Sequence, residues 1–442
     1  MSSSARKSKI VLLTGNSLCH NPRTMKEASA LARAGHDVQI LGAWLDRDFK
    51  ARDERLIETI RFTFIPVLDF TLPGMGNEVG SFMRRVGKRA ADLGYRLAGR
   101  QTSHQLGFGI ERMFRQALQI PADLYIAHSE ASLEVGRRLL RSGRRVAIDM
   151  EDWFSEDLLP EARRQRPLGL LRALEKELLS HGAYASCPSH AMSTALAGEY
   201  GCTSPTVIYN AFEWSERQAL DGRISDRRNR DIPSIHWYST TLGPGRGLEE
   251  LVAAIPLLQH DAEVHFRGKP APGFAEWVTE QAPDHWRDRI FFHPLVTNDR
   301  LVSRIAEHDV GFAGEMKYCR SRDLTVTNKI LHYLLGGLAV VASDTAGQRE
   351  VAGQAPEAVL LYPSGDARAL ADVLNSLFAS PERLQRAKAA ALKAAQKTFS
   401  WERQEGALLD AVARALAGAR RDQPMPDDAA GRDSAARSLG IR

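Results

Sequence analysis

The chain has few cysteines, and none stand at a spacing that binds metal. Cys19, Cys187, Cys202 and Cys319 are scattered through 442 residues, with no Cys-x-x-Cys pair. This arrangement excludes a disulfide-stabilised secreted scaffold and a structural zinc site. Reduced thiols in a cytoplasmic protein are the simplest interpretation.

Long hydrophobic runs are also missing. No stretch reaches the roughly 18 apolar residues that a membrane-spanning helix needs. The run that starts at Ile10 ends in Thr14-Gly-Asn16, which is too short for a secretory signal. We therefore expect a protein that neither spans a membrane nor carries an export signal.

Three nucleotide-binding signatures are absent. The loop after the first apolar run lacks Gly-x-Gly-x-x-Gly, and the second run ends Ile40-Leu-Gly-Ala-Trp44 without an acid, which argues against NAD. No Gly-Lys-Ser/Thr closes a P-loop. No Asp-x-Asp lies beside a plausible donor loop, so we expect no metal and no cofactor.

The composition is that of an ordinary globular protein. Hydrophobic residues make up 43% and charged residues 26%, which is enough apolar content for more than one core. The net charge of +5 is mildly basic and gives no reason to expect a nucleic-acid partner.

Short apolar runs alternate with helical patterns along most of the chain. Strands are predicted at 10–14, 38–42, 61–67, 124–127, 145–149, 184–187 and 206–209, then at 234–239, 263–267, 289–292, 309–313, 338–342 and 357–361. Strands that alternate with helices predict parallel sheets covered on both faces. Two such series predict two Rossmann-like, doubly wound α/β domains facing across a cleft.

The domain boundary is predicted near residues 214–231, which are polar and charged as a linker should be. We assign 9–213 to an N-terminal acceptor domain and 232–398 to a C-terminal donor domain. A last helix is expected at 399–418, and residues 419–442 have little to bury and predict a disordered tail.

The clearest candidate site opens the second domain. A strand runs into Thr240-Thr-Leu-Gly-Pro-Gly-Arg-Gly247 and then a helix at 248–258. The alternate glycines Gly243, Gly245 and Gly247 let backbone amides approach an oxyanion, and Arg246 adds a cation. The loop predicts a diphosphate site; the alternative is a glycine-rich turn with an exposed arginine.

Asn328 and Lys329 start a predicted helix that ends at Gly336-Gly337. A lysine there opposes the helix dipole, which makes sense if an anion binds. The alternative is a solvated lysine beside a core-facing helix.

Polar residues also follow strands of the first half. Gly15 permits a tight turn, Asn21 can cap the next helix, and Arg23 and Lys26 lie near the start of that helix. We favour two solvated cations on a capped helix here.

Two further strands of this half end in ionisable groups, which are His128, Asp149, Glu151 and Asp152. Because the carboxyl ends of parallel strands share one edge, they could hold sugar hydroxyls or an acceptor. The alternative is that each is a cap or turn residue.

Residues 81–115 carry eight basic and two acidic side chains. Phe82, Val86, Leu93 and Leu97 recur at helical spacing on one face. A basic amphipathic helix can lie on an anionic bilayer surface. The alternative is that the apolar stripe packs on the sheet of its own domain.

These residues resemble the retaining glycosyltransferases of the GT-B fold, in the family 4 group. The similarity spans roughly 9–418 and rests on four segments: Asn21-Pro-Arg-Thr-Met-Lys-Glu27, Gly243-Pro-Gly-Arg-Gly247, Asn328-Lys-Ile-Leu-His-Tyr-Leu334 with Gly337-Leu-Ala-Val-Val-Ala-Ser343, and Phe399-Ser-Trp-Glu402. In that family the last segment starts a helix that crosses back to the N-terminal domain.

One departure concerns the two glutamates that flank seven residues in the family. His332 stands at the second position, which commonly holds the nucleotide ribose. The first position falls near Asp323 and Leu324, and the nearest upstream glutamate is Glu315. The resemblance implies donor contacts for Asn328, His332, Glu315 and Gly15.

The resemblance implies transfer of a sugar from a nucleotide diphosphate sugar to a glycan or lipid-linked acceptor, with retention and without a metal. Arg246, Lys329 and His128 are the expected catalytic residues, and Arg23, Asp149, Glu151 and Asp152 the acceptor-side candidates. A cytoplasmic enzyme of polysaccharide or glycolipid synthesis, in peripheral contact with the inner face of the membrane through 81–115, is expected. The alternatives are a sugar-nucleotide epimerase and a non-catalytic carbohydrate-binding protein.

Overall fold

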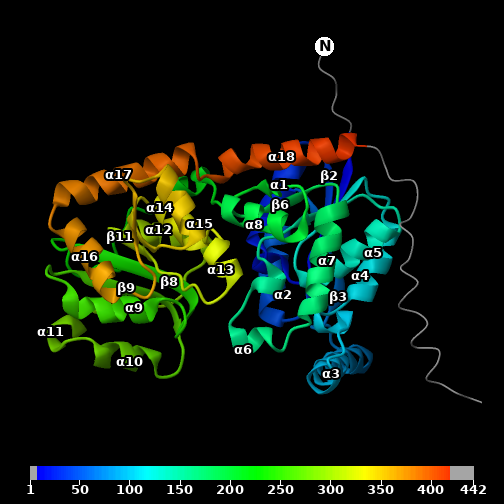
Figure 1. Ribbon diagram of the computed structural model, residues 1–442, viewed down its shortest axis with the longest axis horizontal. Coiled ribbons are helices and arrows are strands. Elements are labelled where there is room, and N and C mark those ends of the chain that lie inside the picture. The colour runs from blue at the N-terminus through cyan, green and yellow to red at the C-terminus, as the bar shows by residue number, and fades with distance from the viewer. Residues whose placement is uncertain (1–6, 419–442) are drawn as a thin grey trace, which may run out of the picture.

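The computed structural model describes residues 7–418 as two α/β domains, each with one parallel sheet covered by helices (Figure 1). The predicted disordered tail at 419–442 lies outside the described residues.

The N-terminal sheet has seven strands in the order β3-β2-β1-β4-β5-β6-β7. Their bounds are β1 Lys9–Leu13, β2 Asp37–Trp44, β3 Thr63–Asp69, β4 Leu124–Ala127, β5 Val146–Asp149, β6 Ala185–Cys187 and β7 Thr206–Val207. The intervening helices are α1 Pro22–Arg33, α2 Arg47–Ile57, α3 Met75–Ala98, α4 Ile110–Gln119, α5 Glu130–Arg141, α6 Pro160–Arg163, α7 Leu168–His181 and α8 His190–Tyr200.

The C-terminal sheet has six strands in the order β10-β9-β8-β11-β12-β13. Their bounds are β8 Ser234–Leu242, β9 Glu263–Pro270, β10 Ile290–His293, β11 Val310–Ala313, β12 Ala339–Ser343 and β13 Val359–Tyr362. The helices are α9 Leu248–Ala254, α10 Phe274–Gln281, α11 Asp284–Arg287, α12 Asn298–Ala306, α13 Arg320–Leu324, α14 Asn328–Gly336, α15 Ala346–Gln354, α16 Ala367–Phe378, α17 Pro381–Lys397 and α18 Trp401–Ala417.

Every strand predicted from an apolar run is present, and the doubly wound fold class is confirmed. The reason is burial on both faces: the Ile10–Leu13 stretch, like most of the other strands, has no exposed side chain. The helix predicted at 248–258 is wrong at its end. It stops at Ala254 and continues as a 3-10 turn over Ile255–Leu257, because Pro256 lacks the amide that would extend it.

Helices α17 and α18 run along one side of both domains (Figure 1). α17 packs on α14 of the C-terminal domain, and α18 packs on α1 of the N-terminal domain. Leu408 and Val412 of α18 are buried in one core cluster with Ile10 and Leu12 of β1. The chain therefore crosses back to the N-terminal domain, as the resemblance implies.

The polar segment at 214–231 does not behave as a free linker. Asp221 pairs with Arg304 at 2.7 Å, the amides of Ser225 and Asp226 donate to Glu307, and the amide of Asn229 donates to Glu263. Part of the segment is thus bound to the C-terminal domain through its backbone amides and through Asp221.

Beneath this segment lie four histidines of the C-terminal sheet: His236, His265, His293 and His308. Their rings stack at centroid distances of 4.5 to 5.2 Å in the pairs 236–308, 265–308 and 265–293. Asp226 lies 3.5 Å from the ring of His293 and also pairs with Arg267. Burial lowers the pKa of His265 to about 2 and that of His293 to about 4, with the nearby charges of His308 and Arg267 adding to the effect.

Helix α3 projects from the N-terminal domain beyond its layers (Figure 1). Phe82 is 63% exposed, Leu93 54% and Leu97 79%, and Met75, Val79, Met83 and Val86 are exposed as well. The apolar stripe does not pack on its own sheet, so that interpretation of the stripe is wrong. Among the described residues, no helix is long and apolar enough to cross a bilayer.

Candidate active site

Loops at the carboxyl ends of the two sheets meet between the domains. The amide of Trp153, which follows β5, donates to Ser321 Oγ of α13 at 3.1 Å. On α15, Glu350 accepts from the amides of His190 and Ala191 at the start of α8, at 2.9 to 3.2 Å. Both domains therefore present their strand ends to one region.

The glycine loop after β8 has the backbone shape that its sequence predicts. Gly245 and Gly247 have φ values of 75° and 76°, which favour glycine. A Cβ on Gly247 would lie 2.8 Å from the carbonyl oxygen of Gly314, so the loop packs directly on the end of β11. The amide of Gly245 donates to Glu249 at 2.6 Å, and Gly243 is buried.

Arg246 extends from this loop with an exposed guanidinium, which donates to Ser239 Oγ at 3.0 Å. No carboxylate of the described residues forms an ion pair with it. It is a cation free to meet an anion at the edge of the sheet.

Lys329 and Glu315 form an ion pair on the same edge. Lys329 Nζ lies 3.0 Å from Glu315 Oε1, and the two side chains are 18% and 10% exposed. The ammonium also lies 5.2 Å from the ring centroid of Trp237. Glu315 is held in place because its amide donates to Ser343 Oγ, and that hydroxyl donates back to the Glu315 carbonyl, both at 2.7 Å.

Helix α14 starts at Asn328 without a side-chain cap at its first amides. Asn328 is exposed, so its side chain and the uncapped amides are open to a ligand. The glycine loop, Arg246, Lys329 and this helix start converge around Gly314 and Glu315. Together they make a positively charged edge suited to a diphosphate.

His332 lies deeper than the resemblance implies. The ring is 3% exposed, stacks on Phe212 at a centroid distance of 3.9 Å, and shares a hydrogen bond of 2.9 Å with the Tyr238 hydroxyl. Burial lowers the pKa of His332 to about 3, and the charge of Lys26 adds to this. The expected ribose contact is corrected: Phe212 covers the ring, so a ribose reaches it only if Phe212 moves.

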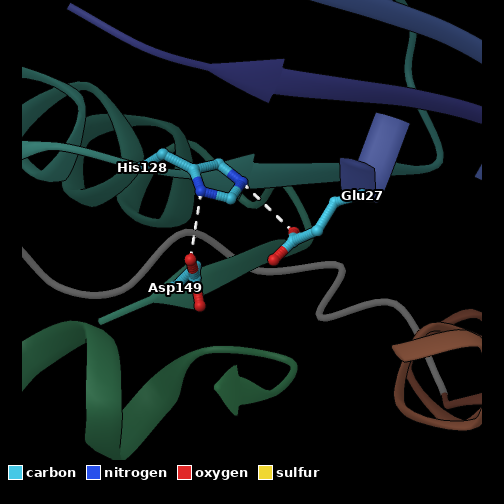
Figure 2. A group of neighbouring side chains, drawn as sticks. All are labelled: Glu27, His128 and Asp149. Atoms are coloured by element: carbon cyan, nitrogen blue, oxygen red, sulfur yellow. Dashed lines mark ion pairs between the residues drawn. The ribbon is translucent and has the colours of Figure 1, made fainter. Parts of the chain in front are cut away.

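In the N-terminal domain, four predicted or neighbouring charges form one buried cluster, part of which Figure 2 shows. Arg23 donates to both oxygens of Asp149, at 2.6 and 2.8 Å. The ring of His128 lies between Asp149, at 3.2 Å, and Glu27, at 3.4 Å. All four side chains are fully buried.

Two expectations about the start of α1 are wrong. Arg23 is not a solvated cation but anchors the chain leaving the domain, since it also donates to the carbonyl of Ile208 at 2.6 Å. Nor does Asn21 cap α1 with its side chain, which donates to the carbonyl of Ser17 instead. Arg23, His128 and Asp149 face one another, and none exposes a surface to a sugar or an acceptor.

Protonation in the cluster follows from its charges. Burial would raise the pKa of Asp149, but the Arg23 guanidinium and His128 hold it well below its usual range. Burial and the charge of Asp149 raise the pKa of Glu27 to about 7. Burial alone would lower the pKa of His128, but Glu27 and Asp149 outweigh it and raise that pKa.

Glu27, His128 and Asp149 are also the one group of described residues with spacing that could hold a metal ion. Their donor set would suit a divalent cation. However, both oxygens of Asp149 already accept from Arg23, whose Nε is also 3.5 Å from Glu27. A dication here would lie against a guanidinium, so these residues do not fit a metal site.

Glu151 and Asp152 lie partly buried between the domains. Burial, followed by the charge of Asp157, raises the pKa of Asp152 to about 7, and burial likewise raises the pKa of Glu151. Arg322 of α13 is 3.8 Å from Asp157 and carries the opposing charge. Of the acceptor-side candidates, these two carboxylates remain available to a ligand.

Gly15 lies beside this region, but its amide is already used. It donates to Ser129 Oγ at 3.0 Å, and a Cβ at Gly15 would lie 3.1 Å from that of Ala131. A donor contact through this amide would require Ser129 to turn away.

Three residues that join the domains have no recognisable signal in the sequence. Arg322, Glu350 and Trp153 stand among ordinary loop and helix residues, and only their partners across the boundary give them a role. The apolar-polar pattern of one domain carries no information about the surface of the other.

Comparison with protein families gives one match, which lies within the C-terminal domain. Residues 235–380 match the family model described as glycosyl transferases group 1. No curated protein matches the chain.

Solved structures match nearly the whole chain at low identity. Anabaena Alr3699/HepE in complex with UDP and glucose has a TM-score of 0.64 and 16% identity, over 92% of this chain and 99% of that one. Sucrose-phosphate synthase from Thermosynechococcus elongatus has a TM-score of 0.66 and 15% identity, over 93% and 100%. WaaG, a glycosyltransferase involved in lipopolysaccharide biosynthesis, has a TM-score of 0.55 and 12% identity, over 90% and 98%.

These similarities establish the GT-B fold for the two domains. They place the glycosyltransferase signature in the C-terminal domain, which holds the glycine loop and Lys329.

Proposed function

We propose that the protein is a glycosyltransferase that moves a sugar from a nucleotide diphosphate sugar to a glycan or lipid-linked acceptor, with retention at the anomeric carbon. The observation that carries this is the convergence of the glycine loop, Arg246, Lys329 and the uncapped start of α14 at one edge of the C-terminal sheet. The group 1 family match over 235–380 and the UDP named with HepE support it.

The chemistry follows from where charge develops. When the glycosidic bond breaks, negative charge grows on the departing diphosphate. Preorganised cations and amides at that point lower the barrier. Arg246 and Lys329 are the proposed cations, and the amides of the glycine loop and of α14 are the proposed donors. Since two cations already stand there, the proposed reaction uses no metal.

Glu315 gives the site a way to hold Lys329 before the donor arrives. The Glu315 carboxylate pairs with the Lys329 ammonium at 3.0 Å and keeps it oriented. A diphosphate carries more charge than one carboxylate, so it would draw Lys329 to itself. We propose that Glu315 then faces the sugar.

On the N-terminal side, Glu151 and Asp152 are the proposed acceptor contacts. Because they are fully buried, the side chains of His128, Arg23 and Asp149 hold the strand ends in position and do not themselves contact a ligand. The proposed setting is cell-surface polysaccharide or glycolipid synthesis at the cytoplasmic side of a membrane, with α3 as the peripheral contact. The exposed apolar stripe of α3 supports that contact.

The test is release of nucleoside diphosphate from a panel of sugar nucleotides, with and without glycan or lipid-linked acceptors. Acceptor-dependent release from one donor, with the anomeric configuration kept by NMR, is expected. Conversion of the donor sugar without any acceptor would identify an epimerase instead. Binding of sugar nucleotides or glycans without turnover would identify a carbohydrate-binding protein.

A further inference from the structure

A groove of about 710 Å³ lies between α3 and the segment that leads into α4. Basic side chains dominate its charged lining, with Glu111 as the one carboxylate among the described residues. The basic residues include Arg84, Lys88, Arg112, Arg115 and Arg138.

Three of these cations have carboxylate partners. Lys88 lies 3.2 Å from Asp92, and Arg115 and Arg138 lie 2.7 and 3.0 Å from Glu111. Arg84 and Arg112 have no ion pair with any carboxylate in the described part of the chain. Both guanidiniums belong to the lining of the same groove. Burial lowers the pKa of Arg84, and the charge of Arg112 lowers it further.

Two arginines that line one groove without a carboxylate partner among the described residues repel each other, and an anion bound in the groove would offset that repulsion. Guanidiniums bind phosphate well because their planar N–H groups match two of its oxygens. Met83 also lines the groove and is 59% exposed, as part of the apolar stripe with Val79 and Phe82. The groove therefore offers a charged end and an apolar side, which suits a phosphate that carries a hydrocarbon chain.

The groove also lies near the strand ends of the N-terminal sheet. Gly107 in its wall is close enough to α5 that an added Cβ would lie 2.9 Å from Ala131. Two residues before Ala131, Ser129 accepts from the amide of Gly15 at the end of β1. A ligand whose phosphate lies in the groove could extend its remaining groups to the strand ends of the N-terminal domain.

We propose that this groove binds the phosphate of a membrane lipid that carries the sugar acceptor, with Arg84 and Arg112 as the anion ligands. This inference rests on the proposed function, and it assigns a phosphate-linked lipid as the acceptor class. The stripe of α3 would lie on the bilayer while the phosphate enters the groove from the membrane surface.

The test compares two double variants with equal charge loss. R84Q/R112Q removes the groove cations, and R89Q/R100Q removes two exposed arginines of the same region that do not line the groove. Binding is measured by sedimentation with phosphatidylcholine vesicles with and without phosphatidic acid, and by calorimetry with dihexanoyl phosphatidic acid below its micelle concentration. Circular dichroism checks the fold of both variants.

We expect one soluble lipid molecule bound per chain, with affinity reduced by at least about tenfold in R84Q/R112Q, because two charge-assisted contacts are lost. R89Q/R100Q should keep that affinity and lose only part of the vesicle binding. Equal losses in the two variants would overturn the proposal, because they indicate general attraction to a charged surface. Inorganic phosphate that binds as tightly as the lipid would also overturn it, since the occupant would then be a free anion.

Turnover of a sugar nucleotide, measured in parallel, separates the two claims. If the donor is turned over but the groove variant binds the soluble lipid normally, the groove assignment fails and the enzyme stands. If the lipid binds at the groove but no donor is turned over, the proposed function fails and the lipid site stands.

Discussion

The two domains present the same kind of sheet edge but treat charge in opposite ways. At the C-terminal edge, Arg246 is exposed and Lys329 keeps 18% of its side chain accessible. At the N-terminal edge, Arg23 and His128 both pair with Asp149, and all three side chains are fully buried. One edge is prepared to receive an anion, and the other has used its charges to hold the domain together.

The largest effect is expected from Asp149 in the buried cluster of the N-terminal domain. Asp149→Asn should lower the free energy of unfolding by about 3–5 kcal/mol, because it removes the carboxylate to which the buried Arg23 donates two hydrogen bonds. Denaturant unfolding followed by circular dichroism measures this. Asp261→Asn is the matched control, since its pair with Arg289 is exposed and should contribute no more than about 1 kcal/mol. Similar losses in the two variants would mean that Asp149 is not a structural partner.

The histidines of the two domains should respond to pH in opposite directions. The pKa values of His265 and His293 are lowered in the folded state, so the unfolded chain binds more protons below about pH 6.5. Their contribution is therefore favourable at neutral pH and is lost progressively as the pH falls from about 6.5 to about 4. His128 has a raised pKa, so its contribution has the opposite sign: it is present in acid and lost as the pH rises.

Hydrogen exchange at neutral and mildly acidic pH measures the contrast domain by domain. Acid should reduce the protection of β9 and β10 while β4 and β5 keep theirs. His293→Asn should remove part of the acid sensitivity of the C-terminal sheet. A uniform loss of protection in both domains would contradict the contrast.

The rate of sugar transfer tests the roles proposed for Arg246 and Lys329 at the edge of the C-terminal sheet. Arg246→Ala and Lys329→Ala should each lower the transfer rate by at least about tenfold, because each removes a group that stabilises developing charge. The melting temperature should change little, in contrast to Asp149→Asn. The double variant should lose less than the product of the single losses if both cations face one diphosphate. Lys393→Ala on the exposed side of α17 is the control, and near-normal rates in both single variants would remove the assignment.

A smaller effect is expected at His332. The ring is covered by Phe212 and bonded to Tyr238, so His332→Ala should lower the melting temperature and leave donor affinity unchanged. Glutamate stands at this position in the family that the chain resembles. His332→Glu would bury a carboxylate beside Phe212, so this variant should be less stable than the unchanged protein. Calorimetric titration with the donor decides this, and a clear loss of affinity in the alanine variant would restore the ribose contact.

The smallest expected effect is that of chelation. Transfer should continue unchanged in EDTA, because two cations stand where a metal would neutralise the diphosphate, and Arg23 occupies the one metal-like cluster of the described residues. Complete loss of activity that magnesium or manganese restores would contradict this.

Local pattern was enough to predict the strands, the two doubly wound domains and the glycine loop. In this chain the short apolar runs formed buried parallel strands, and the alternate glycines before a helix formed a turn with positive φ at Gly245 and Gly247. The last helix, expected at 399–418, runs from Trp401 to Ala417.

Only the tertiary structure decided which ionisable residues are free. Arg23 and Arg246 both stand near the start of a helix. Asp149, which is 126 residues from Arg23 in the chain, lies against Arg23, whereas no carboxylate of residues 7–418 pairs with Arg246. Likewise, the sequence of the α3 stripe is the same whether the stripe is buried or exposed, and only the packing shows that residues 7–418 leave it exposed. A sequence sets which side chains carry charge or apolar surface, whereas desolvation and pairing depend on residues brought together from distant segments.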